Sequence, residues 1–215
     1  MIGLGAGGHS TVLIEALAAI GGYEVVGLLD PRQELHGTTV LGIPVLGDDG
    51  LIGEHYDSGV RHAFIGLGGA SDTAPRRRLY ELARSSGLDV VTVVHPAASV
   101  SPSAELGHGA TVFAGAVVGT EARLGENVLV NTAAVVEHGC TVGDHAHVAT
   151  GARLASGVRV GEGAHIGAGS TVVQERSVGP SAVVGAGAVV VRDVEAGMVV
   201  VGVPARVLRP VGDGS

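Results

Sequence analysis

Aromatic residues are scarce in this 215-residue chain: they make up 2% of it and tryptophan is absent, although 46% of the residues are hydrophobic. A thin core built from valine and alanine needs no large rings, whereas a thick globular interior usually has them. The 37 glycines indicate many turns. The composition therefore favours a narrow, turn-dense fold, and the length allows one large or two modest domains.

Cysteine and clustered basic residues are also limited. Cys140 is the one cysteine, which excludes an internal disulfide, and we expect its thiol to be a small buried hydrophobe. The formal net charge is −8 and the only basic run is Arg76–Arg78, which argues against a nucleic-acid or membrane-surface partner. The negative net charge does not exclude local basic pockets that bind phosphates. The sequence shows no signal-peptide pattern and no apolar run long enough to span a bilayer, so we expect a cytoplasmic protein.

An aliphatic residue recurs every six positions over about a hundred residues, without exception. The positions are Val94, Val100, Leu106, Val112, Val118, Leu124, Val130, Val136, Val142, Val148, Leu154, Val160, Ile166, Val172, Val178, Val184 and Val190. A helix would need a spacing near 3.6 and a simple strand a spacing near 2. A strict period of six predicts a solenoid of short strands and turns, with three hexads in each coil of roughly 18 residues.

A second series supports the solenoid, because the residue four positions after each aliphatic one is almost always small. One large and one small inward residue per hexad suit the core of a triangular coil. Arg176 is the exception, and an unpaired cation in the core is costly. We therefore expect residues 174–177 to form a local distortion or a turned-out corner. Glycine often follows the aliphatic residue, as at Gly107 and Gly125, and is expected to supply a tight or left-handed corner.

The period is absent before about residue 93. The pattern there predicts helices over residues 10–20, capped by Ser10 or Thr11, and over residues 76–86. Strands are predicted over residues 24–29, 62–67 and 90–94. Strand alternating with helix indicates an α/β unit with a parallel sheet. The chain is therefore expected to divide into a Rossmann-like domain at residues 1–93 and a solenoid domain with a C-terminal extension at residues 94–215.

Glycines near the start follow the pattern G-x-G-x-x-G at Gly3, Gly5 and Gly8. Such a turn places backbone N–H groups and a helix N-terminus against a phosphate. Asp30 follows about 20 residues later, where an acidic side chain can bind a ribose hydroxyl. A complete dinucleotide fold needs roughly twice this length, so NAD is not expected, but half of one can hold a single nucleotide such as the uridine diphosphate of an activated sugar. A glycine turn that binds nothing is the alternative.

Polar residues concentrate between Asn131 and His147. His138 takes the third position of its hexad, which points outward. With Glu137 beside it and Asp144 nearby, an outward histidine can act as a general base. His147 and His165 are one coil apart, which predicts a polar ladder on one face of the solenoid.

Two other interpretations of these polar residues stay open. His145, His147 and His165 could supply imidazoles to a metal ion from adjacent coils. A carboxylate-supported open zinc site is not evident, and we expect no metal. The polar residues could also be surface features of a scaffold without catalytic activity.

The chain resembles the sugar O-/N-acyltransferases of the sialic acid O-acetyltransferase (NeuD) family. The resemblance covers nearly the whole chain and includes Gly5–His9, Asp30, the stretch from Asn131 to His138, His147, Gly151 and the ending Gly202–Arg206. It implies a small Rossmann-like α/β domain followed by a left-handed parallel β-helix of hexapeptide repeats. It also implies a homotrimer, with acetyl-CoA bound between neighbouring β-helices. The family includes bacterial enzymes that acetylate the 4-amino group of nucleotide-linked aminosugars.

The resemblance also implies roles for individual residues. His138 matches the general base of the family, and we place Glu137 and Asn131 beside it in the catalytic site. His147 matches a residue that approaches acetyl-CoA from the neighbouring subunit. Two positions match those whose backbone lines the acetyl-CoA groove: Ala168 and Ala186. The nucleotide-sugar pocket is matched by Gly7, Gly8, His9, Asp30, Pro31 and Gly68.

One position departs from the family pattern. A carboxylate usually follows the catalytic histidine and raises its basicity, whereas this chain has Gly139; Glu137 or Asp144 could take over. We expect direct transfer of an acetyl group from acetyl-CoA to an amino or hydroxyl group of a nucleotide-activated sugar, with His138 as the base. The alternatives are an acceptor that is not linked to a nucleotide and a non-enzymatic trimeric scaffold, which Gly139 would favour.

Overall fold

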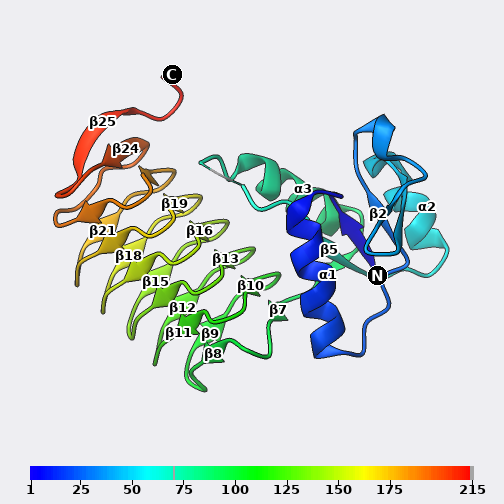
Figure 1. The fold of residues 1–215 in the computed structure, drawn as a ribbon, viewed down its shortest axis with the longest axis horizontal. Coiled ribbons are helices and arrows are strands. Elements are labelled where there is room, and N and C mark those ends of the chain that lie inside the picture. Colours follow the sequence, from blue (N-terminus) through cyan, green and yellow to red (C-terminus); the bar gives the residue numbers. More distant parts are fainter. Residues whose placement is uncertain (70, 214–215) are drawn as a thin grey trace.

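The computed structural model of the chain describes residues 1–69 and 71–213. Figure 1 shows a small α/β domain beside a stack of parallel coils that ends in a hairpin. The predicted combination of an α/β domain and a parallel β-helix is confirmed. Within the described residues, no helix has both the length and the apolar character needed to cross a membrane.

A six-stranded sheet forms the first domain, in the order β3-β4-β2-β1-β5-β6. Its strands are β1 (Ile2–Leu4), β2 (Gly27–Leu29), β3 (Thr39–Val40), β4 (Ile43–Gly47), β5 (His62–Ile65) and β6 (Asp89–Val90). All neighbours are parallel except β3 and β4. Although β1 has only three residues, it lies inside the sheet and pairs with β2 on one side and β5 on the other, and its Ile2 and Leu4 are fully buried. The carboxyl ends of β1, β2 and β4 therefore meet at one edge.

The helices of this domain are α1 (Gly8–Ile20), α2 (Ile52–Asp57) and α3 (Ala74–Ser85), with short 3₁₀ turns η1 (Gln33–Leu35) and η2 (Asp49–Leu51). The helix α1 lies on the side that faces the coils (Figure 1). Its buried Leu13 and Leu17 belong to one apolar cluster with Phe113 and Leu129 of the coils. This shared core fixes the α/β domain against the β-helix.

The N-terminal cap of α1 differs from the prediction. Gly7 occupies the cap position, and Ser10 lies buried inside the first turn. The Ser10 hydroxyl lies 2.6 Å from the Gly5 carbonyl and 3.2 Å from that of Gly66. Thr11 donates to the Gly8 carbonyl instead of capping. Ser10 therefore connects the turn after β1 with the turn after β5.

The bounds of the other helices and strands differ from the predicted bounds by a few residues, and one predicted strand is wrong. The strands predicted over 24–29 and 62–67 are shorter, and the second predicted helix begins two residues earlier. A continuous strand over 90–94 is wrong: Val90 ends β6 in the α/β sheet, whereas Val93 begins the first coil strand. The sequence pattern could not show that this apolar run passes from one sheet to another.

The coils form three parallel sheets, one on each side of a prism. The first contains β7 (Val93–Val94), β10 (Thr111–Val112), β13 (Leu129–Val130), β16 (His147–Val148), β19 (His165–Ile166) and β22 (Val183–Val184), extended by β24 (Met198–Val201) and β25 (Arg206–Pro210). The second contains β8 (Ser99–Val100), β11 (Val117–Val118), β14 (Val135–Val136), β17 (Arg153–Leu154), β20 (Thr171–Val172) and β23 (Val189–Val190). The third contains β9 (Glu105–Leu106), β12 (Arg123–Leu124), β15 (Thr141–Val142), β18 (Arg159–Val160) and β21 (Ser177–Val178).

Each aliphatic residue of the predicted series is the second residue of a two-residue strand, which confirms the period. Val112, for example, pairs with Val94 below it and Val130 above it. The aliphatic and small positions together form one continuous buried core that also includes Cys140. The narrowness of this core explains why the sequence manages with so few aromatic rings.

The glycines that follow the aliphatic residues have a different role from the predicted one. None of them has a positive φ; the left-handed residues come two positions later, as at Gly109 and Asn127. Instead, a Cβ at these glycines would lie between 2.1 and 2.7 Å from an atom of the next coil or the strand that follows it. At Gly125 it would meet Asp144. Glycine is therefore needed for close stacking of the backbones, not for turning the chain.

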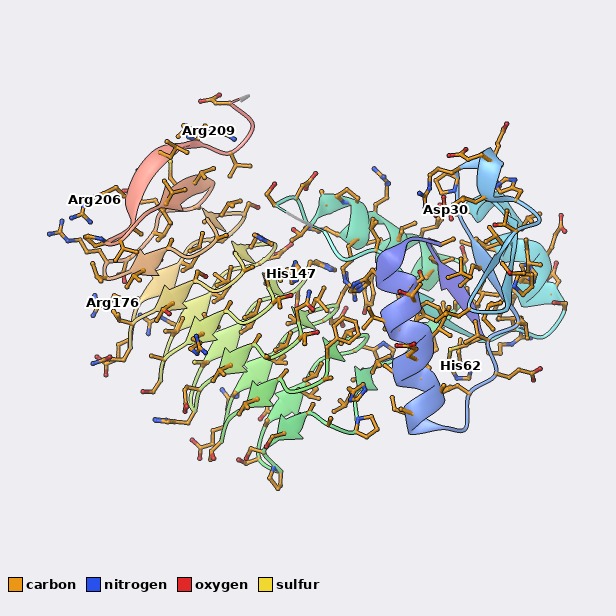
Figure 2. All side chains as sticks on the ribbon, viewed as in Figure 1. Asp30, His62, His147, Arg176, Arg206 and Arg209 are labelled. Carbon is orange, nitrogen blue, oxygen red and sulfur yellow. The ribbon has the colours of Figure 1, made fainter. Side chains whose placement is uncertain are left out.

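Arg176 turns out of the prism without distorting the backbone. Gln174 and Glu175 form an ordinary turn and β21 follows in register. The guanidinium points away from the coils (Figure 2), and Nη1 lies 3.7 Å from an Asp193 carboxylate oxygen. The last coil is shortened, so that Val194 pairs with Val178 instead of lying over Arg176. The predicted turned-out corner is thus confirmed and the predicted distortion is wrong.

Candidate functional site

A groove runs along the first coil sheet where the α/β domain meets it. We call it the coil groove; its volume is about 390 Å³. Of the predicted site residues, it brings together Asn131, His147, Ala168 and Ala186. Gly69, from the turn after β5, forms part of its wall. The small side chains of Ala168 and Ala186 leave the backbone open to a ligand at this wall.

His147 connects the coil groove to the α/β domain (Figure 2). Its Nδ1 lies 2.9 Å from the Gly69 carbonyl oxygen, and its Nε2 lies 3.2 Å from the Asn131 amide nitrogen. A carbonyl can only accept, so Nδ1 carries the proton and Nε2 accepts from the amide. Burial, with a smaller contribution from His165, lowers the pKa of His147 to about 3. The ring is therefore neutral near pH 7 and holds the turn after β5 in place.

The predicted ladder of His147 and His165 is confirmed. The two residues are paired in the sheet register, and their rings meet edge to face with centroids 4.9 Å apart. His145 lies at another corner, where Nδ1 is 3.1 Å from the Asn127 amide nitrogen and the ring packs on Tyr80. Within residues 1–69 and 71–213, no group of three or more histidine, cysteine or acidic side chains could hold a metal ion.

His138 lies away from the coil groove, in the exposed corner between β14 and β15. The carboxylate of Glu137 accepts the backbone N–H of His138 at 3.3 Å. Asp144 lies at the following corner of the prism, after β15, and its carboxylate accepts the backbone N–H of Glu126 at 2.7 Å. Asp144 is thus held against the coil below, and the prediction that it lies near His138 is wrong. Within one chain, the predicted base and the coil groove occupy different corners.

A second pocket lies at the edge where β1, β2 and β4 end. We call it the glycine-turn pocket; its volume is about 410 Å³. Of the predicted nucleotide residues, it is lined by Gly7, Asp30 and Pro31. Gly8 is the first residue of α1, so the helix N-terminus opens toward this turn. Arg32, Asp49 and Arg78 also line the pocket and were not singled out from the sequence.

Asp30 is buried, and both of its carboxylate oxygens are engaged. Oδ2 accepts hydrogen bonds from the Ala6 backbone N–H at 2.8 Å and from Arg32 Nη2 at 2.9 Å. Oδ1 accepts hydrogen bonds from Arg32 Nε at 2.8 Å and from the Arg32 backbone N–H at 3.0 Å. These hydrogen bonds, those of the Arg32 side chain above all, lower the pKa of Asp30 to about 2. The carboxylate therefore organises the glycine turn, and a bond from it to a ribose hydroxyl would require Arg32 to move.

Gly68 lies in the chain between Leu67 and Gly69, which line the two pockets, and it lies close to His9. The His9 ring packs against Phe113 of the coils, with centroids 5.2 Å apart, and burial followed by the charge of Arg76 lowers its pKa to about 3. A Cβ at Gly68 would lie 3.1 Å from His9 Nδ1. Arg76 is fully buried and donates to the carbonyls of Ile65 and Leu67. Of the predicted residues of the α/β domain, His9 is thus the one that packs on a ring of the coils within the described residues.

Comparisons with known proteins agree with this arrangement. Residues 2–82 match the family described as the PglD N-terminal domain. No curated protein sequence gives a match. Perosamine N-acetyltransferase from Caulobacter crescentus, crystallised as a histidine-to-asparagine variant with CoA and GDP-perosamine, is 36% identical, with a TM-score of 0.91 over 97% of this chain and 96% of that chain.

Two further structures are similar. The acetyltransferase domain of PglB from Neisseria gonorrhoeae FA1090, crystallised with acetyl coenzyme A, is 38% identical, with a TM-score of 0.89 over 96% of this chain and 98% of that chain. WeeI from Acinetobacter baumannii AYE is 23% identical, with a TM-score of 0.75 over 97% of this chain and 99% of that chain, and supports the fold alone.

An α/β domain joined to a left-handed β-helix, with a groove along the coils, defines a two-domain acyltransferase of the hexapeptide-repeat class. The similarity over whole chains narrows this class further. The chain belongs to the NeuD-like family of sugar acetyltransferases, as the sequence resemblance indicated.

Proposed function

We propose that this protein transfers an acetyl group from acetyl-CoA to an amino group of a nucleotide-activated sugar. The coil groove would hold the acetyl-CoA arm against Ala168 and Ala186, and the glycine-turn pocket would hold the nucleotide. One supporting relative is an N-acetyltransferase crystallised with CoA and GDP-perosamine, and another is an acetyltransferase domain crystallised with acetyl coenzyme A. The amine is therefore the favoured acceptor.

One observation carries this proposal: the two pockets share the turn after β5. Leu67 lines the glycine-turn pocket and Gly69, two residues on, lines the coil groove and accepts from His147. A nucleotide whose diphosphate lies at the N-terminus of α1 would extend its sugar past His9 toward the groove. Binding both substrates on one rigid junction brings the amine to the thioester by proximity.

His138 acts as the general base in this reaction. The neutral amine attacks the thioester carbonyl, a C–N bond forms and the C–S bond breaks. His138 takes the proton released by the amine and returns it to the departing thiolate. Backbone N–H groups of the coils would stabilise the oxyanion. Cys140 is buried, with its thiol directed at the Ala155 carbonyl, so it supplies no nucleophile and transfer is direct.

The active form would be a homotrimer. His138 and the coil groove lie at different corners of one prism. A neighbouring copy packed along the groove would bring its own His138 toward Asn131 and His147, so that each site forms between two chains. Such an enzyme would work in the cytoplasm, where we expect the chain to be.

The test is release of free thiol from acetyl-CoA across a panel of GDP-, UDP- and CMP-linked sugars that carry amino or hydroxyl groups. We expect release with a nucleotide-linked aminosugar and a product heavier by one acetyl group in mass spectrometry. Release with free sugars or amino acids alone would overturn the nucleotide assignment. Absence of both thiol release and acetyl-CoA binding would instead indicate a scaffold.

A further inference from the structure

The glycine-turn pocket contains a feature that a phosphate or ribose site does not need. The pocket extends from Gly5 and Gly7, where a diphosphate would lie, to Asp49. In the sheet order, β4 lies beyond β2 on the side away from β5, and Asp49 follows β4. In a nucleotide bound across the ends of parallel strands, the base lies beyond the ribose, farthest from the phosphates. Asp49 would therefore face the base of a nucleotide bound in this way.

Asp49 presents an acceptor that nothing in the described part of the chain uses. Its side chain is half-buried, and Oδ1 is buried without a hydrogen-bond partner in residues 1–69 and 71–213. The adjacent Asp48, by contrast, accepts the Gly50 N–H at 2.9 Å. Burial, followed by the charges of Asp48 and Asp30, raises the pKa of Asp49. A desolvated carboxylate of this kind is stabilised by N–H donors from a ligand.

The surroundings of Asp49 suit a planar ring. Pro31, Leu67, Pro75 and Leu79 supply apolar walls to the pocket, which falls within the usual size range of small-ligand sites. Arg78 lines the same pocket and offers a cation to carbonyl or phosphate oxygens. The walls can sandwich a base while Asp49 reads its edge.

Only one common base matches a carboxylate at that edge. Guanine carries two neighbouring donors, the ring N1–H and the exocyclic amino group, which can bind both oxygens of a carboxylate. Uracil and thymine place carbonyl oxygens on both sides of a single N–H, and these would repel a carboxylate. Adenine and cytosine place an amino group beside an unprotonated ring nitrogen, which also repels it.

We propose that Asp49 reads the Watson–Crick edge of guanine, and that the acceptor of this enzyme is a GDP-linked aminosugar. The inference rests on the proposed function, because it assumes that the glycine-turn pocket holds the nucleotide. It goes further by assigning the base and the residue that selects it.

The test is calorimetric binding of GDP, IDP and UDP to the full-length wild-type protein, Asp49→Asn and Asp48→Asn. IDP differs from GDP only in lacking the exocyclic amino group. For the wild type we expect GDP to bind about tenfold more tightly than IDP and about 100-fold more tightly than UDP. In Asp49→Asn the preference for GDP over IDP should fall to within about threefold. Asp48→Asn, the matched control, should keep the wild-type preference because Asn can still accept the Gly50 N–H.

Several outcomes would overturn the role of Asp49. These are UDP binding as tightly as GDP to the wild type, an unchanged ratio of GDP to IDP affinity in Asp49→Asn, or no nucleotide binding at all. The wild-type comparison tests the preference for guanine even if a variant fails to fold. Thiol release with a UDP-linked aminosugar but not with a GDP-linked one would sink the guanine assignment and leave the acetyltransferase proposal standing. No binding of any nucleotide and no thiol release would remove both.

Discussion

Replacing His147 with glutamine should make the folded protein less sensitive to acid. Burial holds the pKa of His147 at about 3, against 6.5 for an ordinary histidine. The unfolded chain therefore binds a proton that the folded protein excludes, and stability is lost as the pH falls below about 6.5. At 1.36 kcal/mol per pH unit and one proton, the loss between about pH 7.5 and about pH 5 is about 2 kcal/mol. His9, whose pKa is also about 3, adds a similar loss.

Urea unfolding, followed by circular dichroism at fixed protein concentration across this pH range, measures the effect. The wild type should lose about 4 kcal/mol from the two histidines, and His147→Gln about half of that. Glutamine can still donate to the Gly69 carbonyl, so the contact itself is conserved. His62→Gln is the matched control, since that side chain is 51% exposed in the α/β domain. Equal losses of stability in the wild type and His147→Gln would show that the burial of His147 does not contribute to acid sensitivity.

Two further predictions concern glycines of the coils. Gly125→Ala should cost about 3 kcal/mol of unfolding free energy, because its Cβ would lie 2.1 Å from an Asp144 oxygen and 2.8 Å from the Asp144 nitrogen. In Gly151→Ala only the positive φ is strained, so the loss of unfolding free energy should be about 1 kcal/mol. A larger loss in Gly151→Ala than in Gly125→Ala, measured by urea unfolding, would contradict the role of Gly125 in close stacking of the coils. Gly139→Asp should raise kcat several-fold, because a carboxylate at this position can support the His138 ring. The substitution should lower the unfolding free energy by about 1 kcal/mol, because the backbone has a φ of 66° although the space around a Cβ is open. An unchanged or lower kcat would show that Gly139 does not limit the reaction.

The β-helix could be predicted from the sequence because its contacts repeat at a fixed distance along the chain. Val112 meets Val94 and Val130 for the same reason that every other hexad meets its neighbours. The ladder of His147 and His165 followed from the same register. The glycines show the limit of this argument: their spacing was visible, but the close approach of the next backbone was not.

The candidate site was harder to predict because it depends on contacts between segments that have no fixed spacing. The bond from His147 to Gly69 joins a coil to a turn 78 residues earlier. Asp30 pairs with Arg32, which is close in sequence, but its carboxylate also accepts the N–H of Ala6, which lies 24 residues earlier. Asp49 had no motif at all, and a charged residue after a strand becomes informative only when its burial is known.

The role of His138 is tested most directly by the rate of thiol release from acetyl-CoA, measured with the best nucleotide-linked aminosugar, in the wild type and in His138→Ala. We expect kcat to fall by about 10²- to 10⁴-fold in the variant, with the KM for acetyl-CoA nearly unchanged, because the base acts on the proton of the amine and does not bind the donor. The same thermal unfolding midpoint in both proteins would exclude a folding defect, since the side chain is exposed. A variant that retains the wild-type kcat would contradict the assignment of His138 as the general base.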